Sequence, residues 1–244
     1  MRALRSYTLL IRWQALRLKN MLPLAFLVQS LFAFGIVVGY PLLFPEIDRM
    51  TVLFLATGAP AITLITMGVV VLPQVVAQSK LEGSLEFMRS LPVPRMAYLM
   101  ADLTVWLAVV LPGVVFGVAV GAWAFDIALS ISLAIVPAVL LTVTTAAALG
   151  YALASLLPPM IAMLISQVLV FGVLLFSPIN YPAERLPEWL QTIHDILPVQ
   201  AMGEVVRGSL ATDVFPLNVG PFVVLAVWCL AALGLTYMTL QRRA

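Results

Sequence analysis

The feature that most constrains the fold is a set of long segments without a charged residue. In this chain of 244 residues, 63% of them hydrophobic and 10% charged, Lys, Arg, Asp and Glu are absent from residues 20–45, 50–79, 103–125, 127–183 and 214–241. A helix needs about 20 apolar residues to cross the hydrocarbon core of a bilayer. Four of these segments therefore predict one membrane span each, and the longest, interrupted by Pro158 and Pro159, predicts two.

The predicted spans lie near residues 22–44, 51–78, 103–123, 128–157, 160–176 and 219–240. Their continuous apolar character, without alternation of apolar and polar residues, excludes a transmembrane β-barrel. The first span is too long for the core of a signal peptide and no small-residue cleavage site follows it, so we expect it to be retained. No internal repeat or linker divides the sequence, so we expect residues 1–244 to form one membrane domain.

The distribution of Lys and Arg predicts the orientation. If the amino terminus is cytoplasmic, ten of these cations lie on the cytoplasmic side, and only Arg49, Arg185 and Arg207 lie outside. This division satisfies the positive-inside rule, so we expect both termini in the cytoplasm. The basic inner face suits anionic lipid, and we infer no nucleic-acid partner from it.

Residues 1–20 carry two parallel stripes at seven-residue spacing, a cationic one and an apolar one. The stripes consist of Arg5, Arg12 and Lys19, and of Leu4, Ile11 and Leu18. This pattern is typical of a helix that lies in the membrane interface before the first span. A plain basic anchor beside the membrane explains it equally well.

Polar residues mark one face of the second predicted span. At the α-helical period Thr63, Thr66, Gln74 and Gln78 fall close together in angle, and Pro60 and Pro73 predict kinks. This stripe either lines a path for a transported molecule or forms hydrogen bonds between helices. The fifth span adds Ser166 and Gln167.

Residues 78–95 form a charged segment between the second and third spans. Leu81, Leu85 and Met88 recur at helical spacing, with Glu82, Glu86 and Arg89 on the neighbouring face, before Pro92 and Pro94. The pattern predicts a short amphipathic helix in which Gly83 costs about 1 kcal/mol relative to alanine. Charge pattern alone favours a solvated loop over a docking helix.

A second amphipathic segment, residues 178–213, lies between the last two spans. Pro187 begins one short helix and Pro198 ends it, while Trp189 and Leu190 belong to its apolar face. A second short helix follows near residues 199–210. Neither helix is long enough to cross the bilayer, so both are expected at the outer surface.

Several kinds of chemistry are absent from the sequence. It contains no GxxxxGK[ST] motif and no GxSxG motif, and His194 and Cys229 are its only histidine and cysteine. ATP binding through a P-loop, intramembrane hydrolysis and a His/Cys metal site are therefore unsupported. The predicted spans hold no charged residue, which argues against an ion-coupled carrier. Asp102 is expected at the interface near Arg95 rather than as a proton carrier.

Two motifs occur in the charged and outer segments. The first consists of Glu82, Gly83, Ser84, Leu85 and Glu86, followed by Leu91, Pro92, Val93, Pro94 and Arg95; the second consists of Leu186, Pro187, Trp189, Leu190 and Gln191, followed by Leu197 and Pro198. In this order, within six spans, they resemble the permease subunits of ABC-2 type exporters, a family that includes drug, antibiotic and polysaccharide efflux permeases. One departure is Leu197, where relatives often have Asn.

The resemblance implies an all-α integral membrane fold with six transmembrane helices, an N-terminal interfacial helix, a cytoplasmic coupling helix within residues 79–98 and two outer re-entrant helices. The resemblance implies that a separate ABC ATPase docks on the charged segment. The coupling residues would then be Glu82, Gly83, Leu85, Glu86 and Arg89. Pro187, Trp189, Leu190 and Pro198 become the outer gate. The resemblance also implies that a second permease copy or paralogue completes the transporter, in a prokaryotic cytoplasmic membrane. We expect ATP and Mg to bind the partner ATPase and this chain to bind no cofactor.

The resulting functional hypothesis is the membrane subunit of an ATP-driven exporter, itself not an enzyme. Residues suggested for the path lining are Thr63, Thr66, Gln74, Ser166 and Gln167. Because the predicted spans hold no fixed charge, we expect a hydrophobic or amphipathic cargo. The alternatives are a secondary transporter driven by an ion gradient and a membrane scaffold or immunity protein that transports nothing.

Overall fold

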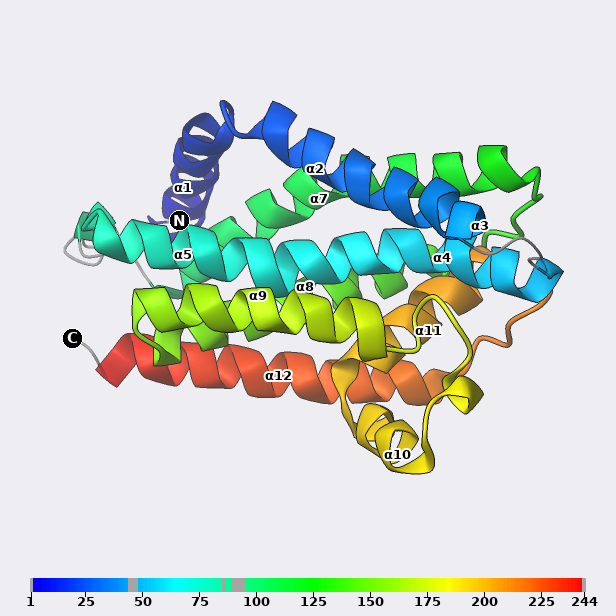
Figure 1. Cartoon of the computed structure of the whole chain (residues 1–244). Coiled ribbons are helices and arrows are strands. Elements are labelled where there is room, and N and C mark those ends of the chain that lie inside the picture. The colour runs from blue at the N-terminus through cyan, green and yellow to red at the C-terminus, as the bar shows by residue number, and fades with distance from the viewer. Residues whose placement is uncertain (1, 44–47, 85–86, 89–94, 243–244) are drawn as a thin grey trace.

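The structure, a computed structural model, describes residues 2–43, 48–84, 87–88 and 95–242 (Figure 1). In this part of the chain, six helices are long and apolar enough to cross a membrane. The regular structure of these residues is helical throughout. The structure therefore confirms the predicted all-α, six-span membrane fold.

The helices follow one another in the predicted order. The first part of the chain forms α1 (Arg2–Leu18), α2 (Leu22–Phe34), η1 (Gly35–Gly39), α3 (Tyr40–Leu43), α4 (Arg49–Thr66), η2 (Met67–Val71) and α5 (Leu72–Leu81). The rest forms α7 (Arg95–Phe125), α8 (Ile135–Leu156), α9 (Pro159–Phe176), η3 (Ala183–Arg185), α10 (Glu188–Ile196), α11 (Pro198–Leu210) and α12 (Val219–Arg242). The second span is the continuous series α4, η2 and α5.

The spans run side by side, and the shorter helices lie at the two ends of the bundle (Figure 1). The α1 end holds α1, the end of α5 and the end of α12, and the α10 end holds α3, α10 and α11. The span made by α4, η2 and α5 lies at the centre, since 89% of its most apolar 18 residues are buried, against 17% for α9. The second span therefore connects the two ends through the middle of the molecule.

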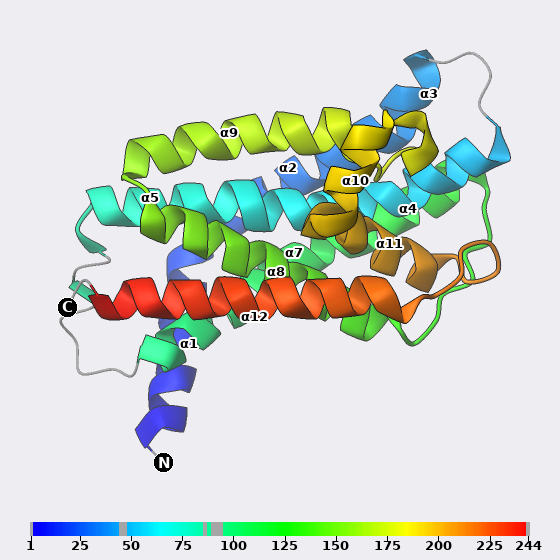
Figure 2. The same ribbon diagram turned by 90° about the horizontal axis from the view of Figure 1, so that it is seen from below.

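Helix α1 lies across the direction of the spans (Figure 2). Ile11 and Leu18, from the apolar stripe, pack on a core cluster around Leu99 and Trp106. The cationic residues of the other stripe, Arg5, Arg12 and Lys19, are exposed. This arrangement agrees with an amphipathic helix at the membrane surface.

Two of the spans contain a π-helical turn shortly before a proline. The turn η1 precedes Pro41, and η2 precedes Pro73. Proline lacks an N–H donor, and its ring clashes with the carbonyl four residues earlier. A π turn shifts the hydrogen bonds by one residue, as in the bond from the Leu72 N–H to the Met67 carbonyl. The predicted kink at Pro73 is thus taken up by the widened turn.

Helix α8 packs directly on this widened turn through glycines. A Cβ atom added to Gly150 would strike the backbone carbonyl oxygen of Gly68, and one added to Gly68 would strike Ala146. Small residues let membrane helices approach this closely.

We expect Gly150→Ala to lower the thermal midpoint, because the new methyl group has no space against the Gly68 backbone. Overpacking of this kind costs about 1–3 kcal/mol. Differential scanning fluorimetry of the purified chain would measure the shift. Gly172→Ala is the matched control, since a Cβ atom there meets nothing within 4 Å. Equal midpoints for the two variants would contradict the proposed close contact.

The fourth span begins later than predicted. The expected helix near 128–157 starts only at Ile135, so the short connection implied by the predicted spans 103–123 and 128–157 is wrong. Residues 127–134 instead bind the end of α11 and the segment that follows it. The Ser132 N–H donates to the Ser209 carbonyl of α11, and the Thr212 N–H donates to the Ser130 carbonyl. These bonds hold the serine-containing stretch outside a helix. They also join the loop after α7 to the α10 end.

Candidate functional site

The charged turn after α5 begins where the central span ends. Gly83 has a φ of 71°, and its N–H donates to the Lys80 carbonyl. A positive φ of this kind favours glycine and ends a helix. The predicted helix with Gly83 in its interior is therefore wrong at this position, because Gly83 terminates α5. Leu85, Glu86 and Arg89 lie outside the described residues.

Arg17 of α1 holds this turn. Its guanidinium donates to the Ser79 hydroxyl at 3.0 Å and to the Ser84 hydroxyl at 3.3 Å, and it lies 3.7 Å from the Glu82 carboxylate. The Gln78 amide donates to the same carboxylate at 2.8 Å. The helix that lies across the bundle and the turn after the central span therefore form one unit.

A lysine fixes the same end of the span to the next hairpin. The Lys80 ammonium donates to the backbone carbonyls of Ala154 and Leu157, at the end of α8. Cations at a helix C-terminus satisfy its last carbonyls and suit the helix dipole. The turn therefore has polar contacts with both α1 and α8.

In the described part of the charged segment, the outer surface combines the carboxylate of Glu82 with apolar side chains. The Glu82 side chain is 51% exposed, and Leu81 and Phe87 are 64% and 63% exposed. Such a surface suits a protein partner that presents cationic and apolar groups.

Arg17 and Phe87 were missed by the sequence analysis. Phe87 could have been suggested as an aromatic residue in a charged segment, but no local pattern distinguishes Arg17 from its cationic neighbours.

The five suggested path residues do not form one site. Thr63, Thr66 and Ser166 are buried within the bundle, and the Thr63 and Ser166 hydroxyls donate to carbonyls of their own helices. Gln74 is half-buried and Gln167 is exposed. The predicted polar stripe thus separates into a buried part before the π turn and a more open part after it.

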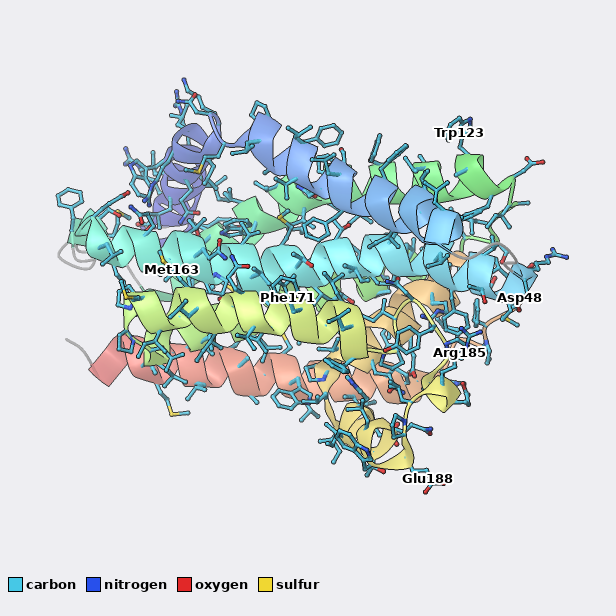
Figure 3. The ribbon with its side chains drawn as sticks, in the orientation of Figure 1. Asp48, Trp123, Met163, Phe171, Arg185 and Glu188 are labelled. Carbon is cyan, nitrogen blue, oxygen red and sulfur yellow. The ribbon has the colours of Figure 1, made fainter. Side chains whose placement is uncertain are left out.

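Gln74 lines a pocket beside the charged turn. The pocket has a volume of about 350 Å³ and is lined by Arg17, Leu18, Met21, Val71, Gln74, Val75, Gln78, Glu82 and Met163. Figure 3 shows Met163 on α9, next to α5. Apolar walls with a cation, a carboxylate and two amides suit an amphipathic molecule.

The suggested gate residues lie on or beside α10 and α11. Pro187, expected to begin the first short helix, is the N-cap of α10, and Pro198, expected to end that helix, instead begins α11. Trp189 is 66% exposed, Leu190 is half-buried and Pro198 is buried. The Trp228 indole of α12 donates to the Ile196 carbonyl at 2.9 Å and so fixes the end of α10.

A buried arginine joins α11 to the central span. Arg207 is 6% exposed, its guanidinium donates to the Ile179 carbonyl, and its charge lies 3.9 Å from the centre of the Phe54 ring of α4. Burial lowers the pKa of Arg207 to about 10, which still leaves it charged at neutral pH. The carbonyl and the aromatic rings of Phe54 and Phe215 stabilise this charge. The sequence analysis missed this role because the partners are distant in sequence.

Glycines let the backbone before α10 approach these helices. A Cβ atom on Gly58 of α4 would lie 2.5 Å from the Asn180 side chain, and one on Gly203 of α11 would lie 3.3 Å from Ile179. The segment after α9 is therefore packed between α4 and α11. It presents the Ile179 carbonyl to Arg207.

His194 of α10 is buried, and we expect it to make the stability of the α10 end depend on pH. Its side chain is 5% exposed, and its Nδ1 has no hydrogen-bond partner among the described residues. Burial lowers the pKa of His194, although a hydrogen bond with the Phe176 backbone and the charge of the nearby Asp195 oppose this shift. The unfolded chain therefore binds a proton more readily, so stability is complete above the ordinary histidine pKa of about 6.5 and decreases as pH falls below it.

The thermal midpoint at pH 5.5 and at pH 7.5 tests this expectation. We expect a lower midpoint at the lower pH and a smaller difference in the variant His194→Gln. A pH dependence that is unchanged in this variant would contradict it.

Six apolar spans, with a charged turn at one end and two short helices at the other, define a multi-pass membrane protein whose central helix links both ends. The family model described as ABC-2 type transporter matches residues 2–211, and the chain belongs to this family. It is the permease component of an ABC transporter and does not itself form the ATPase. A comparison with curated proteins gives no match.

Proposed function

We propose that this chain is the permease subunit of an ATP-driven exporter and that the turn formed by Leu81, Glu82, Gly83 and Ser84 receives a separate ABC ATPase. The single observation that carries the proposal is the position of this turn: it ends the most buried span, and Arg17 holds it while Glu82 stays half exposed. Leu85 and Glu86 continue the same sequence motif, and Arg89 follows in the same charged segment. ATP and Mg would bind the ATPase, in the cytoplasm.

The central span supplies a mechanical connection for this function. Its cytoplasmic end in this proposal is the charged turn, and its other end carries Phe54 beneath Arg207 of α11. A displacement of the turn by the ATPase would move Phe54 and, through it, the helices that carry the gate residues Trp189 and Leu190. In this way ATP hydrolysis at one surface would open a path at the other.

The exposed polar groups of the spans support a location for the cargo path. Gln74 and Gln78 line the pocket beside the turn, and Gln167 is exposed on α9 among Leu164 and Val168. An amide facing lipid is unfavourable, because it has no hydrogen-bond partner there. We therefore place a second permease copy against this face of α9, with a hydrophobic or amphipathic cargo passing between the two copies. The chain lies in a prokaryotic cytoplasmic membrane with both termini inside.

The proposal is tested by purifying the tagged chain from its native membranes in mild detergent. We expect a P-loop ATPase to copurify in equal amounts and the complex, in vesicles, to transport a hydrophobic dye only with ATP. Transport that survives ATP depletion but stops with an uncoupler would show an ion-driven carrier instead. An intact ATPase complex that moves no cargo would favour a scaffold.

Crosslinking tests the second copy separately. The chain's own cysteine, Cys229, is buried and can be replaced by alanine. In that background we expect Gln167→Cys to form a disulfide-linked dimer in membranes. The control Val223→Cys, exposed on α12, should remain monomeric. Equal crosslinking at both positions would remove the support for a dimer at α9.

A further inference from the structure

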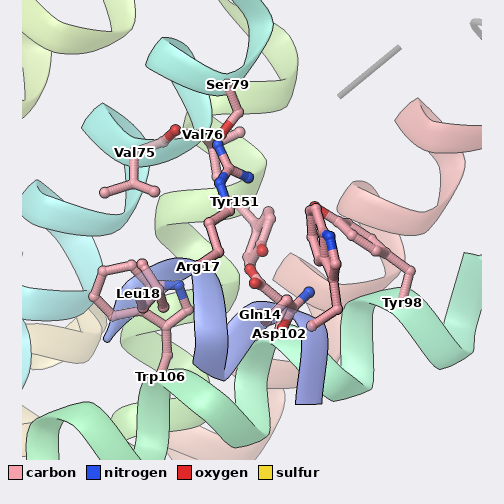
Figure 4. Close-up of a pocket in the computed structure, with 11 residues that line it drawn as sticks. Gln14, Arg17, Leu18, Val75, Val76, Ser79, Tyr98, Asp102, Trp106 and Tyr151 are labelled. Atoms are coloured by element: carbon pink, nitrogen blue, oxygen red, sulfur yellow. Dashed lines mark hydrogen bonds between the residues drawn. The ribbon is translucent and has the colours of Figure 1, made fainter. Parts of the chain in front are cut away.

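A small polar cavity lies where α1 crosses the bundle. It has a volume of about 30 Å³ and is enclosed by residues of α1, α5, α7 and α8, among them Gln14, Trp106 and Tyr151. Figure 4 shows Gln14, Asp102 and Tyr151 together at this place. The three residues belong to α1, α7 and α8, respectively.

Two polar side chains at the cavity, Gln14 and Tyr151, have no hydrogen-bond partner among the described residues. Gln14 is 3% exposed, and neither its amide nitrogen nor its amide oxygen forms a hydrogen bond with another described residue. The Tyr151 side chain is 5% exposed, and its hydroxyl also forms no hydrogen bond with another described residue. Asp102 is 9% exposed and lines the cavity together with Gln14 of α1. Arg17, the cation whose charge acts on Asp102, pairs with Glu82 instead.

The size and chemistry of the cavity match one kind of occupant. A buried water needs at least about 10–15 Å³ and two to four polar partners. Gln14 and Tyr151 together offer donors and acceptors, and Asp102 offers acceptors. A metal cation fits poorly, because the Arg17 guanidinium lines the same cavity. Buried polar groups without any partner are unfavourable, and water removes this penalty.

We propose that the cavity is a hydration site in which ordered water bridges Gln14 of α1 to Asp102 of α7 and Tyr151 of α8. This water fastens α1 to the spans, in addition to the direct bond of 2.8 Å between the Tyr7 and Thr104 hydroxyls. The proposal concerns the folded chain alone and does not depend on the ATPase or the cargo.

Two substitutions distinguish a hydrated cavity from a dry one, because the thermal midpoint should fall in the first case and stay the same or rise in the second. In a hydrated site, Gln14→Leu and Tyr151→Phe each remove a partner of the water, so each should lower the thermal midpoint by about 2–4 °C. The double variant should lose less than the sum, because one bridge is lost only once. Thr142→Val is the matched control: its buried hydroxyl also lacks a partner but lines neither this cavity nor the pocket beside Gln74. Its midpoint should stay unchanged or rise.

If Gln14→Leu and Tyr151→Phe both behave like Thr142→Val, the proposal is overturned. The melts are repeated with choline in place of sodium and potassium. Equal midpoints in the wild type are expected, and a midpoint that requires an alkali cation would overturn the proposal in favour of a cation site.

Radiolytic footprinting in oxygen-18-labelled water tests the unaltered protein. Tyr151 and Trp106, each 5% exposed, line the cavity and should be oxidised by radicals formed from the enclosed water. Met67 and Met202 are 1% and 0% exposed and lie away from it, so they should stay protected although methionine oxidises readily. Oxidation of Tyr151 and Trp106 no greater than that of these methionines would overturn the proposal.

Discussion

Replacing Glu82 by arginine is expected to stop ATP-coupled transport in a chain that still inserts and folds. The internal pair between Glu82 and Arg17 is largely exposed, and exposed pairs contribute about 0–1 kcal/mol, so folding should change little. At an interface, reversing a charge costs about 2 kcal/mol or more. We therefore expect the ATPase to bind at least about 30-fold more weakly. Binding of the purified ATPase to the chain in nanodiscs, together with dye transport in vesicles, measures both effects.

A charge swap distinguishes direct docking from an effect through Arg17. The double variant Arg17→Glu, Glu82→Arg restores an internal pair of opposite charges while the turn presents a cation. If Glu82 contacts the ATPase, the swap should bind it as weakly as Glu82→Arg alone. Recovery of transport by the swap would instead make Glu82 a positioning residue for the turn. Normal transport by Glu82→Arg would falsify the docking assignment.

Replacing Arg207 by alanine should unfold the α10 end. The variant loses a desolvated cation–π contact with Phe54, worth about 2 kcal/mol, and a charged hydrogen bond to the Ile179 carbonyl, worth about 1.5–3 kcal/mol. A loss of about 4 kcal/mol corresponds to a midpoint lower by roughly 10 °C in a chain of this size. Thermal melting measures this shift, and limited proteolysis should show cleavage between residues 177 and 187.

Two further substitutions control for the loss of charge. Arg207→Lys keeps the charge but loses the planar group that stacks on Phe54, so it should recover less than half of the lost stability. Arg185→Ala removes an exposed arginine from η3, labelled in Figure 3, and should melt like the wild type. A midpoint for Arg207→Ala within 2 °C of the wild type, on the order of 1 kcal/mol or less, would show that the buried contacts contribute little.

The positions of most helices could be predicted, because length and apolar character are local properties. The fifth span was expected near 160–176 and occupies Pro159–Phe176, and the second outer helix was expected near 199–210 and occupies Pro198–Leu210. Prolines contributed to both predictions, since Pro158 and Pro159 marked the break before the fifth span and Pro198 marked the end of the preceding helix. The late start of α8 could not be predicted, because Ser130 and Ser132 bind residues that come some 80 positions later in the chain.

The candidate site was only partly predictable for the same reason. The motif containing Glu82 identifies the turn, but the contact of Arg17 with Ser79 joins residues 62 positions apart. Arg207 and Ile179 are 28 positions apart. Neither pair leaves a periodic pattern in the sequence. The prediction that four polar residues share one face of the second span was wrong for a different reason. The π turn at η2 rotates Gln74 and Gln78 relative to Thr63 and Thr66, so one helical period cannot describe both pairs.

The central position of the second span has a consequence for biogenesis. Chains are synthesised from the amino terminus, so α4 and α5 enter the bilayer before α8, α11 and α12 exist to surround them. The hydroxyls of Thr57 and Thr63 donate to carbonyls of α4 itself, at Leu53 and Ala59. They therefore need no neighbouring helix to satisfy them in lipid. These two hydroxyls of the span that becomes most buried are thus already satisfied before the later spans emerge from the ribosome.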